Sequence, residues 1–244
     1  MKEKFDLSLI LACYNEGTIF KDNVKKVFNV LDQTDFSYEI IFIDDASIDK
    51  TGTAIAKIIK DNPLRNLRSI YHDKNQGRGK TVTEGIREAK GKVVGFIDID
   101  LEIPADYLPR FVNAILSGYD VAIAYRVYDF TLRRLIRWFT SKGYIALRKK
   151  LLKTDLKDTE AGYKFFNRQK ILPILKKTKD PGWFWDTEIM INSSLNNLRI
   201  MEIPTVFIRN FQKKSTVKLI PDTFDYLLKI IKFWQQLKNN QMNK

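Results

Sequence analysis

The chain has 244 residues, of which 44% are apolar, and it carries a formal charge of +13 with a pI near 9.6. It is long enough for one large α/β domain, and its composition excludes a fibrous or disordered protein. No run of 18 apolar residues and no signal-peptide pattern is found, so we expect neither a transmembrane helix nor secretion. The single cysteine, Cys13, favours a reducing, cytosolic location.

Strands and helices alternate along the first half of the chain. The predicted strands cover residues 7–13, 38–45, 67–72, 92–100 and 119–125. The predicted helices cover 18–32, a stretch through 55–59, the residues that follow the glycine-bearing turn "NQGRGK", and 104–116. This alternation predicts βαβ units, hence an α/β fold with a mostly parallel sheet covered by helices on both faces. Ligands bind such sheets at the carboxyl ends of the strands, so the segments "YNE", "DDAS", "NQGRG", "DID" and "YR" should converge on one edge.

Three carboxylates follow the fourth predicted strand, at Asp98, Asp100 and Glu102. In an extended chain they would share one face, where they repel each other. Oxygen-only ligands suit Mg²⁺ or Mn²⁺, and magnesium takes one or two carboxylates together with substrate phosphates. We therefore expect a divalent cation and a diphosphate here; the alternative is an acidic strand end in solvent.

The turn "NQGRGK" can hold phosphate, because its glycines permit close approach and Arg78 and Lys80 supply positive charge. It matches neither the P-loop spacing nor the dinucleotide-binding spacing. The only histidine, His72, is expected to be structural.

The positive charge is concentrated in the second half of the chain. Residues 131–153 contain eight Lys or Arg and no acid, and Arg133, Arg134 and Arg137 flank an apolar helical face. Such a segment fits an anionic membrane interface, and the amphipathic tail 217–244 repeats the pattern. The alternative is a pair of ordinary amphipathic helices packed on the domain. A nucleic-acid-binding module is a remote alternative, because the basic stripe is interleaved with Leu, Ile and Phe and no recognition motif is found.

Eight segments occur in the order typical of family 2 glycosyltransferases: "ACYNE", "DDASIDKTG", "NQGRGK", "DIDLEIP", "YRV", "DTEAGYKFF", "WFWDTEIM" and "EIPTVF". The chain resembles this family over about residues 6–216, and the sixth and seventh segments are most similar to the polyprenyl-phosphate branch, typified by dolichyl-phosphate mannose synthases. The resemblance implies a single GT-A domain over 1–216, a nucleotide sugar as donor, and Mg²⁺ or Mn²⁺ as cofactor.

The resemblance also implies roles for individual residues. It places Ala12, Tyr14, Glu16 and Asp45 near the nucleoside. Asp98, with Arg78 and Lys80 of the glycine-bearing turn, completes the predicted site for the nucleotide sugar. It assigns Asp98 and Asp100 to the metal, with Glu102 where the family often has Gln. It assigns Arg126 to phosphate. The family's C-terminal phosphate-binding pattern is altered here to Arg209 followed by "NFQKKSTVK", so Arg209 and one of Lys213, Lys214 and Lys218, for which we take Lys214, are assigned to the acceptor phosphate.

The implied reaction is an inverting transfer of a hexose from a GDP- or UDP-linked sugar to a polyprenyl (dolichyl or undecaprenyl) phosphate. A lipid phosphate is already an anion and needs no general base. The alternative is a saccharide hydroxyl acceptor, for which Asp186 is the candidate base. We expect a cytoplasmic protein, peripheral on the inner membrane face and held there by its basic helices or by a membrane-protein partner.

Overall fold

The structure is a computed structural model, and it describes residues 3–127, 151–152, 154–209 and 219–242. The chain divides into two compact units, one formed by 1–127 with 158–213 and the other by 128–157 with 214–244. The predicted segment 131–153 and the tail from 217 both fall in the second unit.

The first unit contains a seven-stranded sheet in the order β3-β2-β1-β4-β6-β5-β7. Its strands are β1 (Phe5–Cys13), β2 (Tyr38–Asp44), β3 (Leu67–Tyr71), β4 (Gly91–Ile97), β5 (Val121–Val127), β6 (Tyr163–Asn167) and β7 (Ile200–Val206). All neighbouring strands pair in parallel except at β6, which runs antiparallel to β4 and to β5. The predicted α/β class and mostly parallel sheet are confirmed, and β6 and β7 are additions to the five predicted strands.

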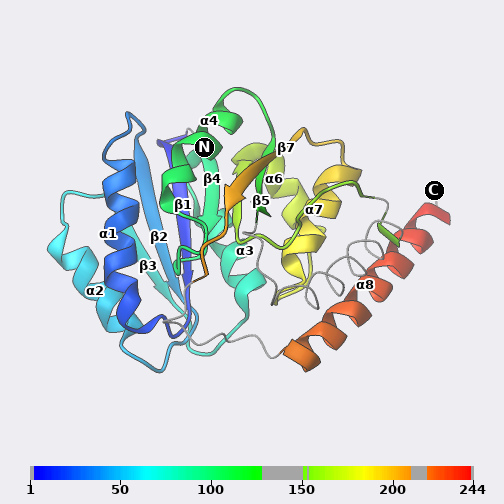
Figure 1. Cartoon of the computed structure of the whole chain (residues 1–244), viewed down its shortest axis with the longest axis horizontal. Coiled ribbons are helices and arrows are strands. Elements are labelled where there is room, and N and C mark those ends of the chain that lie inside the picture. Colours follow the sequence, from blue (N-terminus) through cyan, green and yellow to red (C-terminus); the bar gives the residue numbers. More distant parts are fainter. Residues whose placement is uncertain (1–2, 128–150, 153, 210–218, 243–244) are drawn as a thin grey trace. The chain divides into compact units, whose positions relative to one another are not determined.

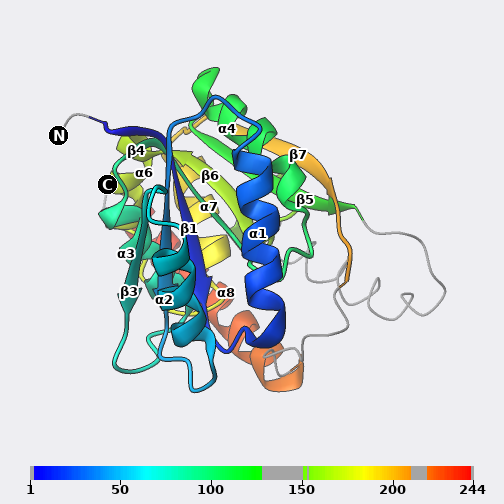
Figure 2. The same cartoon turned by 90° about the vertical axis from the view of Figure 1, so that its left-hand side faces the viewer.

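Helices cover both faces of this sheet (Figure 1). They are α1 (Phe20–Leu31), α2 (Thr51–Asp61), α3 (Arg78–Glu88), α4 (Leu108–Leu116), α6 (Arg168–Leu175) and α7 (Trp185–Leu195), with short 3-10 turns η1 (Gly17–Ile19) and η2 (Ala105–Tyr107). Contacts join α1 to α2 and α4 on one face, and α6 to α3 and α7 on the other (Figure 2).

The core forms because the strands are apolar on both faces, as expected for strands buried between two helical layers. Alternate residues of β1 illustrate this: Leu7, Leu9 and Leu11 join one buried cluster with α1 and α4, whereas Ile10 faces α3. At that point α3 comes so close that a Cβ on Gly85 would lie 2.7 Å from Ile10 Cγ2. A glycine is therefore required for this helix to lie on the sheet.

In the second unit, α8 (Leu219–Met242) is a helix of 24 residues, as the tail pattern predicts. Ile230 and Phe233 are buried, whereas Leu228 and Ile231 are 56% and 41% exposed. Apolar side chains thus occupy two sides of this helix. Across the described ranges, no helix has both the length and the hydropathy that are needed to span a membrane.

Candidate functional site

The carboxyl ends of β1 to β5 lie at one edge of the sheet, because these strands all point the same way. The segments predicted to converge do meet at this edge. The loop after β1 is joined to the loop after β2: Asn15 N donates to Ser47 Oγ at 2.9 Å, and Ile48 N donates to Asn15 Oδ1 at 2.9 Å. Asn15 adopts φ +54°, a conformation that Asn tolerates better than most residues.

The three residues assigned to the nucleoside in the first loop are placed differently from one another. Ala12 is half-buried at the end of β1, and Tyr14 is 37% exposed. Glu16 is only 7% exposed and accepts a hydrogen bond from Tyr14 N at 3.3 Å. Its carboxylate therefore shapes the loop, while the Tyr14 ring is at the surface; the nucleoside contacts stay predictions.

Asp45, also assigned to the nucleoside, is buried and holds the next loop in place. It accepts from Gln76 N at 2.8 Å and from Gly77 N at 2.9 Å. Its Oδ1 lies 2.6 Å from His72 Nδ1, and His72 Nε2 lies 3.0 Å from Glu84 Oε2. Burial lowers the pKa of His72, but the two carboxylates more than offset this and leave that pKa raised. The expectation that His72 is structural agrees with these contacts.

Two glycines fix the start of α3 against the loop before α7. Gly77 has φ +91°, and a Cβ there would lie 2.5 Å from Pro181 O. A Cβ on Gly79 would collide with Trp185. Lys80 N donates to Pro181 O at 3.1 Å, while the Lys80 side chain is exposed. This close packing carries the first residue of α3, Arg78, into the site.

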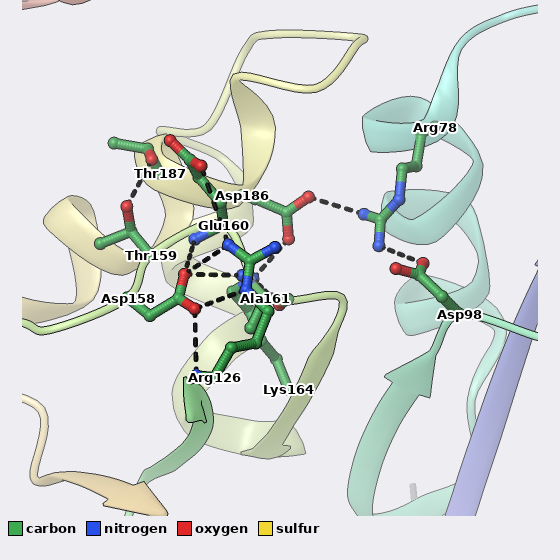
Figure 3. A network of polar contacts seen from close by, with 10 residues as sticks. All are labelled: Arg78, Asp98, Arg126, Asp158, Thr159, Glu160, Ala161, Lys164, Asp186 and Thr187. Atoms are coloured by element: carbon green, nitrogen blue, oxygen red, sulfur yellow. Dashed lines mark hydrogen bonds and ion pairs between the residues drawn. The ribbon is translucent and has the colours of Figure 1, made fainter. Parts of the chain in front are cut away.

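Arg78 joins two predicted site residues that are far apart in the sequence (Figure 3). Its Nη2 donates to Asp98 Oδ1 at 2.5 Å and its Nη1 donates to Asp186 Oδ2 at 2.7 Å. The guanidinium also lies 5.1 Å from the ring centroid of Phe96 and 5.4 Å from that of Trp183. Burial lowers the pKa of Arg78, but Asp186 and Asp98 outweigh it, so that pKa is raised and the charge is permanent.

Sequence reasoning missed Lys164, which lies on β6 with a side chain 0% exposed. Its Nζ donates to Asp186 Oδ1 and to Ala161 O, both at 2.5 Å. Both oxygens of the Asp186 carboxylate therefore accept hydrogen bonds from cations. Lys164 stands within the segment "DTEAGYKFF", but a lysine inside an apolar strand gives no signal that it points at an aspartate 22 residues away.

Arg126, assigned to phosphate, is the penultimate residue of β5 and is gripped by Asp158. Its Nε donates to Asp158 Oδ2 at 2.7 Å and its Nη2 donates to Asp158 Oδ1 at 3.0 Å. Glu160 Oε2 lies 3.8 Å from Arg126 Nη2. Burial alone raises the pKa of Asp158, but Arg126 and backbone amides more than reverse this and leave that pKa lowered. Sequence reasoning did not single out Asp158 or Glu160.

The three carboxylates after β4 do not continue the strand as predicted. β4 ends at Ile97, and a turn follows in which Leu101 has φ +52°. Asp98 is exposed, whereas Asp100 and Glu102 are half-buried, and Glu102 N donates to Asp100 Oδ1 at 3.3 Å. The prediction of one extended acidic face is therefore wrong, because the chain turns at Ile99 and Asp100.

Within the described residues, no group of three or more His, Cys, Asp or Glu side chains is arranged to hold a metal ion. Magnesium and manganese do not require such a group, since one or two carboxylates with diphosphate oxygens suffice. Asp98, whose side chain is 47% exposed, and Asp100 two residues later supply that donor chemistry. These ligand oxygens therefore fit a metal ion held jointly by protein carboxylates and a diphosphate better than a metal ion held by protein side chains alone. The assignment of the metal to Asp98, Asp100 and Glu102 stays a prediction.

Most of the residues assigned to the acceptor lie outside the described residues. Arg209 is exposed at the end of the described part of the first unit. Arg133, Arg134, Arg137 and Lys214 lie outside the described residues.

A mostly parallel α/β sheet with charged loops at its carboxyl edge is the arrangement of a Rossmann-like fold, in which ligands bind at that edge. The sequence model of glycosyl transferase family 2 matches residues 8–173. The chain belongs to this family, as its motifs predict.

Individual relatives agree with this membership. The chain is 29% identical over 222 residues to the dolichyl-phosphate beta-glucosyltransferase of Saccharomyces cerevisiae, a match covering 83% of this chain and 66% of the relative. It is 28% identical over 232 residues to the dolichol-phosphate mannosyltransferase of Pyrococcus furiosus, covering 91% and 61%. The chain thus spans less than two thirds of the length of these curated relatives.

The fold is also similar to a solved structure. Glucosyl-3-phosphoglycerate synthase from Mycobacterium tuberculosis, crystallised with Mn²⁺, UDP-glucose and phosphoglyceric acid, superposes with a TM-score of 0.70 at 15% identity. The match covers 95% of this chain and 80% of that one. At this identity the likeness supports the GT-A fold alone.

Proposed function

We propose that this chain transfers a hexose from a GDP- or UDP-linked sugar to a polyprenyl phosphate, with inversion at the anomeric carbon. Membership of glycosyl transferase family 2 and the similarity to two dolichyl-phosphate glycosyltransferases support the reaction class. The observation that carries the choice of acceptor is the state of Asp186, whose two oxygens already accept hydrogen bonds from Arg78 and Lys164.

A saccharide hydroxyl must lose its proton as it attacks, so it needs a carboxylate with a free oxygen within hydrogen-bond reach. Asp186 is 2% exposed and engaged by two cations, which makes it a poor candidate for this role. A phosphate monoester is anionic at pH 7, and its oxygen can attack without a base. The Asp186 contacts therefore favour the lipid phosphate over the hydroxyl acceptor.

In the proposed step, a phosphate oxygen of the acceptor forms a bond to the anomeric carbon. The bond from that carbon to the donor diphosphate breaks, and the nucleoside diphosphate leaves with the bonding electrons. When bound at Asp98 and Asp100, Mg²⁺ or Mn²⁺ supplies neutralisation of the leaving diphosphate. Arg78, which donates to Asp98, is the protein cation that we assign to the same diphosphate.

Radiolabelled UDP- and GDP-sugars should be incubated with the protein, Mn²⁺ or Mg²⁺, and either a short-chain polyprenyl phosphate or an oligosaccharide. The proposal expects label in the organic phase, released by mild acid as free sugar. Label found only in water-soluble saccharide would favour the hydroxyl acceptor and overturn the lipid assignment.

We propose further that the protein works peripherally at the cytoplasmic membrane face. The acid-free basic segment 131–153 and the exposed Leu228 and Ile231 of α8 support this. Each basic residue near an anionic surface contributes about 1 kcal/mol, so changing Arg133, Arg134 and Arg137 to Gln should weaken binding to anionic liposomes by roughly two decades at low salt. Unchanged liposome binding would remove this membrane role and leave the reaction class standing.

A further inference from the structure

Lys164 is a buried charge that the proposed reaction does not use. It lies on β6, between Phe96 of β4 and Ile123 of β5 in the sheet register. Its side chain is 0% exposed, and burial lowers the pKa of its ammonium group while Asp186 partly offsets that effect. A buried lysine is costly unless it is paired and hydrogen-bonded, so its presence in a strand of the core calls for an explanation.

The contacts of Lys164 continue as a series of hydrogen bonds and ion pairs to Asp98 at the carboxyl edge of the sheet (Figure 3). Ala161 O and Asp186 Oδ1 fix the ammonium, with both distances at 2.5 Å. The other oxygen of Asp186 accepts from Arg78 at 2.7 Å, and Arg78 then reaches Asp98 at 2.5 Å. The series joins β6, α7, α3 and the end of β4, so four elements meet through one chain of charges.

Gly162 shows how tightly this arrangement is built. A Cβ at that position would collide with the Asp98 carboxylate and lie 2.6 Å from Arg78 Nη2. The backbone of the same segment also receives the amide of Asp98, which donates to Gly162 O at 2.9 Å. The segment that carries Lys164 therefore contacts both ends of the ionic series.

We propose that Lys164 is a positioning residue: its ammonium fixes Asp186, and Asp186 fixes the Arg78 guanidinium beside Asp98 for binding the donor diphosphate. The identity of that ligand rests on the proposed function, but the ionic series itself does not. With Lys164 absent, Asp186 keeps Arg78 as a partner, but its own orientation is no longer fixed from the β6 side.

The test is Lys164→Met, which keeps the length of the buried side chain and removes its charge. The KM for the nucleotide sugar should rise about tenfold or more, by analogy with the loss of affinity when residues that orient metal ligands are mutated, while the KM for the lipid acceptor changes little. Combining Lys164→Met with Asp186→Asn should give the same KM as Asp186→Asn alone, because Lys164 acts through Asp186. Additive effects of the two changes would overturn the proposal.

Arg68→Met is the matched control. It removes the cation that donates at 2.9 Å to Glu39, a carboxylate 3% exposed on β2. This variant should lower the melting temperature and leave the donor KM unchanged. If Lys164→Met behaves in the same way, Lys164 is merely structural and the proposal fails. If Lys164→Met alone does not fold, the double variant, which leaves no buried charge unpaired, is used; wild-type donor affinity in that variant would also overturn the proposal.

A second readout is independent of any sugar. The indole of Trp183 is half-exposed and lies 5.4 Å from the Arg78 guanidinium, so its emission reports the position of that group. Lys164→Met should change the tryptophan emission spectrum in the apo protein, and the change should vanish in a Trp183→Phe background. A protein that shows this change yet binds no nucleotide sugar would refute the proposed function and leave the positioning role intact. An unchanged spectrum would refute the positioning role.

Discussion

The grip of Asp158 on Arg126 predicts a large loss of stability when a single charge is removed. The Asp158 carboxylate accepts five hydrogen bonds: from Arg126 N, Nε and Nη2, and from the amides of Glu160 and Ala161 at 3.0 and 3.1 Å. Its side chain is 14% exposed and that of Arg126 is 23% exposed. Asp158→Asn preserves the shape of the side chain but turns an NH₂ group toward these donors.

Removing one partner of a buried ion pair costs about 3–5 kcal/mol, and we expect the lower end, about 3 kcal/mol, because Arg126 keeps some access to water. For a chain of this length, 1 kcal/mol corresponds to roughly 2–4 °C in the melting temperature, so Asp158→Asn should melt about 6–12 °C below wild type. Differential scanning calorimetry at pH 7 measures this difference.

The chain contains a control in Asp32, which also forms a bidentate pair with an arginine, although it accepts from Nη1 and Nη2 of Arg65 rather than from Nε and Nη2. The Asp32 side chain is 43% exposed, and exposed pairs contribute only about 0–1 kcal/mol. Asp32→Asn should therefore shift melting by only a few degrees. Equal shifts for the two variants would refute the reasoning that burial makes the Asp158 pair strong.

The pH dependence gives a second check on the same pair. The pKa of Asp158 is lowered on folding from an ordinary value of 3.8. A group with a lowered folded-state pKa contributes stability that is present above its unfolded pKa and lost as the pH falls through the folded one. The gap in melting temperature between wild type and Asp158→Asn should thus be constant near neutrality and narrow below about pH 4. A gap that widened in acid would contradict the assigned direction.

Three further variants test other parts of the site. His72→Gln removes a histidine whose pKa is raised above 6.5 by Asp45 and Glu84 despite its burial. The variant should therefore be less stable than wild type, most of all below pH 6.5, and the difference should shrink as the pH rises through the raised pKa. Thermal melting in a pH series measures this difference. Gly77→Ala forces a side chain into φ +91° against Pro181 O and should lower the free energy of unfolding in urea by about 1–3 kcal/mol. Gly17→Ala should cost less, because its φ is +62° but no atom of the described residues lies within 4 Å of an added Cβ. Asp100→Ala should abolish Mn²⁺- or Mg²⁺-dependent turnover and also the Mn²⁺-dependent thermal shift with a nucleotide sugar. The melting temperature without ligand should stay near that of wild type. Undiminished turnover in chelator would contradict the metal assignment.

Five strands and their shared carboxyl edge could be predicted because each strand is a short apolar run that ends in polar residues. β7 was not predicted, because Pro204 interrupts the strand pattern of its residues. The structure places β7 at the edge of the sheet, where a missing backbone donor is tolerated. β6 escaped because Lys164 stands in the middle of a five-residue strand, and because an antiparallel strand does not continue the βαβ alternation.

In the candidate site too, local segments predicted the individual residues but not the contacts between distant ones. Arg78, Asp98 and Asp186 were each predicted from a local segment, yet Arg78 and Asp186 are 108 residues apart and no spacing rule joins them. The extended acidic face was predicted from alternation alone, which holds only as long as the strand continues. The turn after Ile97 therefore replaces a row of three carboxylates by an exposed Asp98 and a half-buried Asp100.

The balance of charge at this edge bears on how the donor is bound. The ion pairs around Arg78 and Arg126 involve three cations, which are Arg78, Arg126 and Lys164. Five carboxylates lie near them: Asp98, Asp158, Glu160 and Asp186 in the ion pairs, and Asp100, whose charge helps to raise the pKa of Arg78. These eight side chains together contribute a formal charge of −2 at the edge where we propose that the diphosphate binds. A divalent cation held by Asp98 and Asp100, as predicted, would offset that contribution and share these carboxylates with the diphosphate oxygens. If Asp98 and Asp100 hold the metal as predicted, binding of the metal and binding of the diphosphate depend on each other. The affinity for a nucleotide sugar should then fall sharply in chelator even though Arg78 stays in place.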